Sequence, residues 1–182
     1  MRSVALALAL LLYYAAVVGL HDWVQVLLVH LFNRWGFFGY EMRFVAAWYT
    51  LFAPLCAVTA VALYRRGSRL KMALAATLLL VIVATDHLWL VTMSERVHYA
   101  QYGLLALGLR VLLGNSAWAL LLTALLGAAD ESYQASVLYA HRPDLPLDFK
   151  DMALNIMGGL LGLVVYSAFT TVDKDMDQDD RA

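Results

Sequence analysis

The sequence predicts an all-α fold, a polytopic membrane bundle of about six transmembrane helices. Of its 182 residues, 63% are hydrophobic and only 15% are charged, whereas soluble domains carry roughly 25% charged residues. Apolar runs recur along the chain at about the length that a helix needs to cross a bilayer. The net charge of −1 gives no indication of nucleic-acid binding. The single cysteine, Cys56, excludes an intrachain disulfide and a cysteine-based metal site.

The first expected span is the apolar run Val4 to Leu20, which follows Arg2. We interpret it as an uncleaved helix, with a signal peptide ending near Val17 to Gly19 as the alternative. The next residues, 21–43, mix aromatic with charged side chains, a pattern typical of a segment in the membrane interface. The aromatic residues between 35 and 49 have a second interpretation, as the lining of an acyl-chain groove.

The next two spans are predicted over Phe44 to Tyr64 and Met72 to Thr92. Pro54 lies in the middle of the former and predicts a kink there. The latter carries two ionisable residues near its end, Asp86 and His87.

Three further spans are predicted over Glu95 to Leu113, Ala117 to Leu138 and Leu147 to Phe169. Residues 1–172 would then form a single transmembrane domain, and the polar tail at 173–182 is expected to be a disordered acidic end.

The most basic loop, Arg65 to Lys71, fixes the expected topology. Lys and Arg are retained on the cytoplasmic side, so six spans place both termini in the cytoplasm. Most polar groups of the other loops and spans then fall in the outer half of the bilayer. A charged side chain facing lipid costs at least about 2.5–3.5 kcal/mol. We therefore expect these groups to face one another or a water-filled cavity.

The polar groups are concentrated between Asp130 and Gly162. Asp130 and Gln134 share a helix face because they are four residues apart, and Glu131 is beside them. A second single-face stripe follows at i, i+3, i+7, i+10 and i+14: Asp148, Asp151, Asn155, Gly158 and Gly162. Two prolines between the stripes predict a turn, so the segment should form a helical hairpin.

Residues 94–162 resemble the VanZ-like membrane proteins. The first matching part is Glu95-Arg96-x-His98-x-x-x-Tyr102, where the family usually has Asp-Lys for the first pair. The second part consists of Asp130-Glu131-x-x-Gln134, Arg142, Asp148 or Asp151, Asn155, Gly158 and Gly162. The resemblance implies a four-helix family-like core at about 94–169 with N-terminal additions. It also implies a bacterial cell-envelope protein linked to glycopeptide (teicoplanin) resistance.

These observations define the candidate site residues. The candidate acid–base residues are Glu95, His98, Asp130 and Glu131, and the candidate ligand-binding residues are Tyr102, Gln134, Arg142, Asp148, Asp151 and Asn155. No metal and no cofactor are expected. Several residues have more than one interpretation: Asp130, Glu131 and Gln134 as a structural polar cluster, Arg142 as a partner of Asp144, and Asp86 as structural. His98 has three, namely a hydrogen-bonded partner of Glu95, a general base, or a metal ligand with Asp86 or His87. Gly158 and Gly162 are expected to serve helix packing.

Three functions follow, and whether the chain is an enzyme stays open. The leading hypothesis is an outward-facing polar pocket that binds a cell-wall precursor, its lipid-carrier headgroup or a glycopeptide antibiotic. The alternative is a membrane-embedded enzyme acting on envelope lipids or glycans through the carboxylates and His98. The third is a transporter. The sequence contains no HExxH, GxSxG or CxxC motif. The expected partners are the lipid bilayer and one of these ligands, and the expected location is the bacterial plasma membrane.

Overall fold

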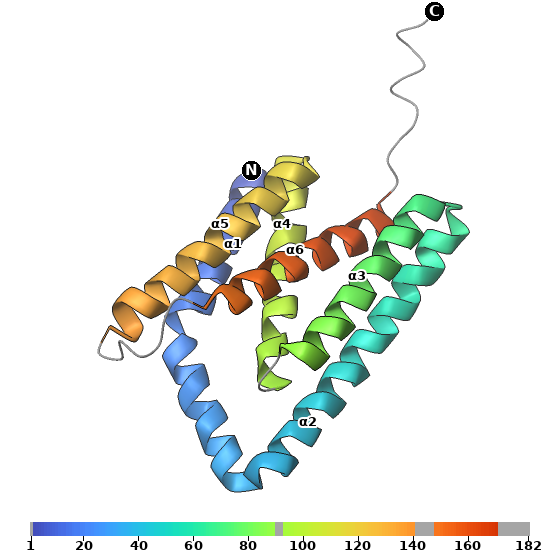
Figure 1. Ribbon diagram of the computed structural model, residues 1–182. Coiled ribbons are helices and arrows are strands. Elements are labelled where there is room, and N and C mark those ends of the chain that lie inside the picture. The colour runs from blue at the N-terminus through green and yellow to red at the C-terminus, as the bar shows by residue number, and fades with distance from the viewer. Residues whose placement is uncertain (1, 90–92, 141–147, 171–182) are drawn as a thin grey trace, which may run out of the picture.

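The computed structural model describes residues 2–89, 93–140 and 148–170, which form six α-helices and contain no β-strand (Figure 1). The all-α prediction is therefore confirmed. A short 3₁₀ turn, η1, precedes α4, and a π-helical turn, η2, follows α5. Arg142 and the acidic tail lie outside the described residues. The helices are α1 (Arg2–Gly19), α2 (His21–Arg65), α3 (Arg69–Leu88), α4 (Val97–Leu113), α5 (Ser116–Tyr133) and α6 (Phe149–Phe169), with η1 at Met93–Arg96 and η2 at Gln134–Leu138.

Helices α4 and α6 cross at the centre of the molecule, where glycines bring their backbones into contact. A Cβ atom at Gly158 would lie 2.9 Å from the carbonyl oxygen of His98, and one at Gly162 would collide with the Gly103 backbone. Small residues allow this approach because no side chain separates the two helices. The interpretation of Gly158 and Gly162 as packing residues agrees with this geometry.

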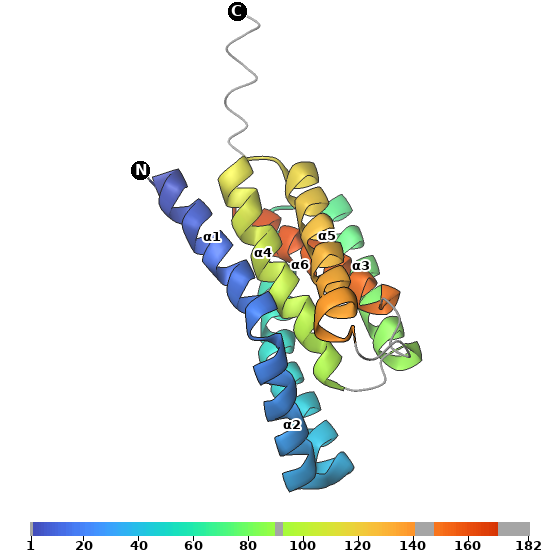
Figure 2. The same cartoon turned by 90° about the vertical axis from the view of Figure 1, so that its left-hand side faces the viewer.

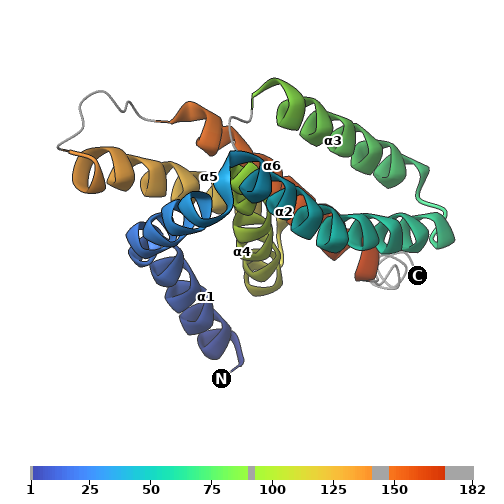
Figure 3. The ribbon, with the colours of Figure 1, turned by 90° about the horizontal axis from the view of Figure 1, so that it is seen from below.

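The remaining helices surround this crossing, with α1 and α3 on opposite sides of it (Figure 3). Tyrosines attach α1 to the centre: the Tyr13 hydroxyl donates to the Gln101 carbonyl at 2.9 Å, and Tyr14 donates to Leu126 at 2.8 Å. On the other side, a buried apolar cluster joins α2, α3, α4 and α6 through Phe52, Ile82, Tyr99, Leu154 and Met157.

Helix α2 contains the sharpest departure from the sequence-based expectation. Residues 21–43 belong to this helix, which reverses direction at Gly36, where φ is +66° and ψ is 169° (Figure 1). This positive φ favours glycine, because a Cβ atom is disfavoured there. Pro54 lies inside the second arm of the helix, but the non-helical backbone angles are at Gly36. The break at Gly36 was not predicted from the sequence, and the kink expected at Pro54 stays a prediction.

Three helices, α2, α3 and α6, are long and apolar enough to cross a membrane. Helix α1 contains a shorter apolar stretch, Ser3–Gly19. Large apolar side chains are exposed on α2 and α3, for example Leu51 at 74% and Leu80 at 71%. A soluble monomer rarely exposes so much contiguous apolar surface, which agrees with contact between these helices and lipid.

The helix ends are sorted between the two ends of the bundle. The start of α1, the α2–α3 turn, the α4–α5 turn and the end of α6 lie at one end (Figures 1 and 2). Arg66 ties part of this end together, because its side chain donates to the carbonyl oxygens of Ser167 and Thr170. The start of α4 and the end of α5 lie toward the opposite end (Figure 1), and these segments contain several of the candidate site residues.

Candidate functional site

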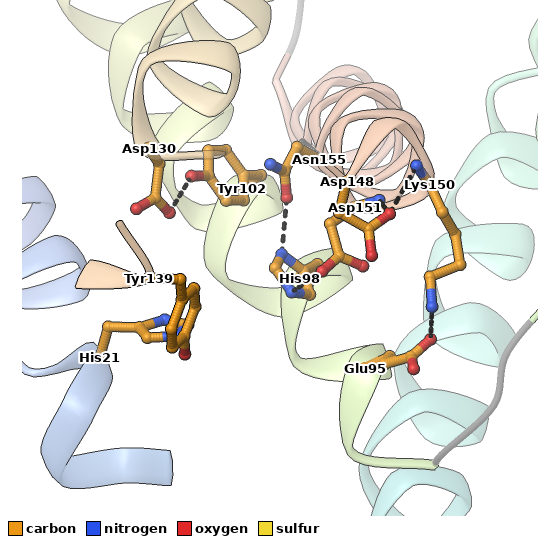
Figure 4. Close-up of polar contacts among 10 residues, drawn as sticks. All are labelled: His21, Glu95, His98, Tyr102, Asp130, Tyr139, Asp148, Lys150, Asp151 and Asn155. Atoms are coloured by element: carbon orange, nitrogen blue, oxygen red, sulfur yellow. Dashed lines mark hydrogen bonds and ion pairs between the residues drawn. The ribbon is translucent and has the colours of Figure 1, made fainter. Parts of the chain in front are cut away.

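A polar cavity of about 300 Å³ lies among α1, α2, α4, α5 and α6, at the end opposite the Arg65–Arg69 turn. Seven of the ten candidate residues line it: Glu95, His98, Asp130, Glu131, Gln134, Asp148 and Asp151. Two more, Tyr102 and Asn155, hold lining residues by hydrogen bonds. The remaining candidate, Arg142, lies outside the described residues. The two polar stripes of the sequence are therefore brought to one place (Figure 4).

The end of α5 and the start of η2 present three buried polar side chains to the cavity. Asp130 and Glu131 are each 3% exposed, and Gln134 is 7% exposed. Asp130 accepts a hydrogen bond from the Tyr102 hydroxyl of α4 at 2.8 Å. Gln134 begins the π-helical turn, in which the Tyr139 amide donates to the Gln134 carbonyl five residues earlier. Such wider turns often occur at functional sites.

His98 links α4 to α6 across the cavity. Its Nδ1 lies 2.8 Å from the amide oxygen of Asn155, and its Nε2 lies 3.6 Å from Asp151. Because an amide oxygen only accepts hydrogen bonds, Nδ1 must carry the proton. In the neutral imidazole, Nε2 is then left as a base or ligand atom on the cavity side.

Asn155 is completely buried, and it packs against Gly127 of α5, which has no side chain to occupy that space. A Cβ atom at Gly127 of α5 would lie 2.9 Å from the Asn155 Cβ and 3.0 Å from its amide nitrogen. The contact between these helices therefore depends on glycine at 127. Gly127 had no role predicted from the sequence, and its spacing of three residues before Asp130 was the signal that could have revealed it.

The first turn of α6 separates the roles of Asp148 and Asp151, and its Lys150 takes the place of His98 as the partner of Glu95. The Asp148 carboxylate caps the helix, accepting from the Lys150 and Asp151 backbone amides at 2.8 and 3.2 Å. Asp151, rather than Asp148, reaches His98. Glu95 does not pair with His98 but forms an ion pair with Lys150 at 2.8 Å.

Asp86 is held apart from the cavity by a pairing of its own. The Nε of Arg96 donates to it at 2.7 Å, and the Tyr99 hydroxyl lies 3.3 Å away. Its neighbour His87 is exposed. The geometry thus favours the structural interpretation of Asp86 and gives no support to a metal site that joins it to His98.

Residues of the N-terminal half complete the cavity, and none of them was predicted from the sequence as a site residue. His21 and Gln25 of α2 line it, and the His21 Nε2 lies 3.0 Å from the Tyr139 hydroxyl. Lys150 and Gln101 are further lining residues without a predicted role. His21 follows the first apolar run directly, but nothing in the sequence predicts its contact with Tyr139, which lies more than a hundred positions later.

The cavity combines several buried polar atoms that lack a hydrogen-bond partner in the described structure. They include Asp130 Oδ1, Glu131 Oε1, Gln134 Nε2 and Asp151 Oδ1. Burying such atoms unpaired costs free energy, so their concentration around one cavity indicates a place where a ligand, water or an ion supplies the missing partners. Comparison with family models, with curated proteins and with solved structures found no match.

Proposed function

We propose that this chain is an integral protein of the bacterial plasma membrane whose polar cavity binds the headgroup of a lipid-linked cell-wall precursor. The observation that carries the proposal is the pairing of this cavity with an apolar groove of about 460 Å³. The two lie on different faces of α4 and share Val97 as a lining residue. An amphipathic lipid needs this combination of surfaces, one for its headgroup and one for its chain.

The groove has the composition expected of a site for a hydrocarbon chain. Its walls come from α2, α4 and α6, and the side chains from α2 are Phe44, Ala47, Trp48, Leu51, Phe52 and Leu55. This location agrees in part with the acyl-chain interpretation of the aromatic residues between 35 and 49. The cavity, in contrast, offers carboxylates and amides that accept from and donate to sugar hydroxyls and peptide amides.

The size of the cavity favours a headgroup over a whole antibiotic. Ligand pockets are typically about 300–1,000 Å³, and this one is at the lower limit. A glycopeptide antibiotic is much larger and would contact only the mouth. Membership of the VanZ-like family, and with it a role in glycopeptide resistance, is a proposal that rests on the motif residues at 94–162.

The proposed orientation has the Arg65–Arg69 turn and both termini in the cytoplasm, with the cavity toward the outer side. It supports access to precursors on the outer leaflet. In a Cys56→Ser background, a cysteine at Trp89, which is 57% exposed, should react with an impermeant thiol reagent in intact cells. A cysteine at Ser68 should react only after lysis. The reverse labelling pattern would place the cavity on the cytoplasmic side and exclude the outer-leaflet proposal.

Binding should be measured with the purified chain and a polyprenyl-pyrophosphate-linked saccharide. We expect saturable binding that Asp130→Asn weakens roughly tenfold or more, because a hydrogen bond to a charged group contributes about 1.5–3 kcal/mol. The substituted amide can still accept from Tyr102, so the fold should be kept. Asp130→Asn and Gln134→Ala should be non-additive, since residues that act as a unit lose most of their effect with the first change.

The matched control is Asp22→Asn, which removes the same charge from an exposed position on α2. It should bind as the parent does. Equal binding by Asp130→Asn and the parent would contradict the proposal, and so would equal weakening by both variants.

An enzyme is the second candidate, and one observation favours it. His98 is oriented by Asn155 and faces the carboxylate of Asp151, an arrangement suited to general acid–base catalysis. Mass analysis of the bound saccharide lipid separates the two candidates. Unchanged ligand after prolonged incubation supports binding alone, and conversion that His98→Gln abolishes supports catalysis.

A further inference from the structure

The cavity contains three side chains whose ligand atoms could surround one ion. His98 of α4, Glu131 of α5 and Asp151 of α6 each offer one atom, and these atoms all lie within 4.8 Å of one another. Two atoms bound to the same ion at about 2.1 Å lie at most roughly 4.2 Å apart. Shifts of several tenths of an ångström would therefore close the three donors around an ion.

A second observation is that two of these three side chains have carboxylate oxygens without a hydrogen-bond partner among the described residues. Glu131 Oε1 and Asp151 Oδ1 are buried and have no hydrogen-bond partner in the described structure. Glu131 as a whole is only 3% exposed. The nearby cations are engaged with other acids, because Lys150 pairs with Glu95 and Arg96 with Asp86. A cation at Glu131 would offset the cost of burying its charge.

The surroundings of His98 are those of a metal ligand. Its Nδ1–H donates to Asn155, which directs Nε2 toward Asp151. Metal-binding histidines almost always donate their second nitrogen to an oxygen in this way. Asn155 itself is completely buried, so the amide that orients His98 is held within the packed interior.

We propose that His98, Glu131 and Asp151 bind one divalent transition-metal ion, Zn²⁺ or Mn²⁺, with water at the remaining positions. One imidazole and two carboxylates suit these ions, whereas an all-oxygen set suits Mg²⁺ or Ca²⁺. Such an ion would also reduce the negative charge of a cavity lined, among the described residues, by five acids and one lysine. The ion-binding proposal does not require the lipid ligand.

The competing explanation is an ion pair between protonated His98 and Asp151, next to an uncharged Glu131. In this arrangement the charges of the three side chains are balanced without a metal ion. The two explanations differ in one measurable quantity, the amount of metal that the purified full-length chain binds after chelator treatment.

The experiment exposes chelator-stripped protein in detergent to ZnCl₂ or MnCl₂ and measures bound metal by mass spectrometry and affinity by titration. We expect one equivalent, with affinity lowered roughly tenfold or more by Glu131→Gln and by His98→Gln, since even residues behind the ligands contribute 10–100-fold. Asp22→Asn should bind as the parent does. Asp151→Asn provides a further variant at a more exposed donor, in case the buried changes prevent folding.

Size-exclusion profiles establish that each variant is folded before the titration. The proposal is overturned if the parent binds neither ion stoichiometrically, or if folded Glu131→Gln and Asp151→Asn bind the metal as tightly as the parent. A chain that binds the headgroup but binds neither metal ion would leave the proposed function standing while this proposal fails. Metal binding without headgroup binding would leave the ion-binding proposal standing and contradict the proposed function.

Discussion

Gly162→Leu should leave almost no folded protein. A Cβ atom at this position already collides with the Gly103 backbone where α6 crosses α4. A backbone cannot rotate away as a side chain can, so the two helices would have to separate. Overpacking of this kind costs about 1–3 kcal/mol for ordinary core insertions and more where nothing can move. The expected result is a loss of monodisperse protein on size exclusion, with the remainder unfolding at lower temperature.

The matched control is Gly19→Ala at the end of α1. No atom lies within 4 Å of a Cβ there, and alanine is the better helix former by roughly 1 kcal/mol. Its yield and unfolding temperature should equal or exceed those of the parent. If Gly162→Leu is as stable as this control, then the close crossing of α4 and α6 is wrong, and with it the placement of Asn155 beside His98.

Apolar runs were sufficient to locate α3, α4 and α6, because such a run is a local property of the sequence. The apolar runs at 72–92, 95–113 and 147–169 correspond to α3, α4 and α6 with ends shifted by a few residues. The stripe from Asp148 to Gly162 was also informative, because its members share the face that meets α4. Its glycines contact the α4 backbone, and Asp151 and Asn155 contact His98.

Other features depend on tertiary structure and leave little trace in the sequence. The reversal at Gly36 was missed, because Gly36 stands among aromatic residues and Pro54 was the more obvious break. Nothing local predicts that α5 widens into a π-helix at Gln134. His21 reaches the cavity only because α1 packs on α4 and α5. The ion pairs could not be predicted from the sequence either, since Glu95 and Lys150 are 55 positions apart in the chain.

Asp86→Ala should destabilise the protein strongly while leaving the cavity chemistry intact. Asp86 is 6% exposed and Arg96 is 4% exposed, and their side chains meet at 2.7 Å. Removing one member of a buried ion pair takes from the other a charge that offsets its burial and costs about 3–5 kcal/mol. Equilibrium unfolding in detergent should therefore show a large loss, whereas His87→Ala, at the exposed neighbouring position, should change little.

Replacing both partners distinguishes a charge effect from a packing effect. Exchange of a whole buried ion pair for apolar side chains is often neutral or even stabilising. The double variant Asp86→Ala, Arg96→Met should accordingly recover much of the stability that Asp86→Ala alone loses. A double variant as unstable as the sum of its two single variants would mean that Arg96 and Asp86 stabilise the protein independently. Metal binding by folded Asp86→Ala should match the parent, because Asp86 pairs with Arg96 and Tyr99 rather than with His98.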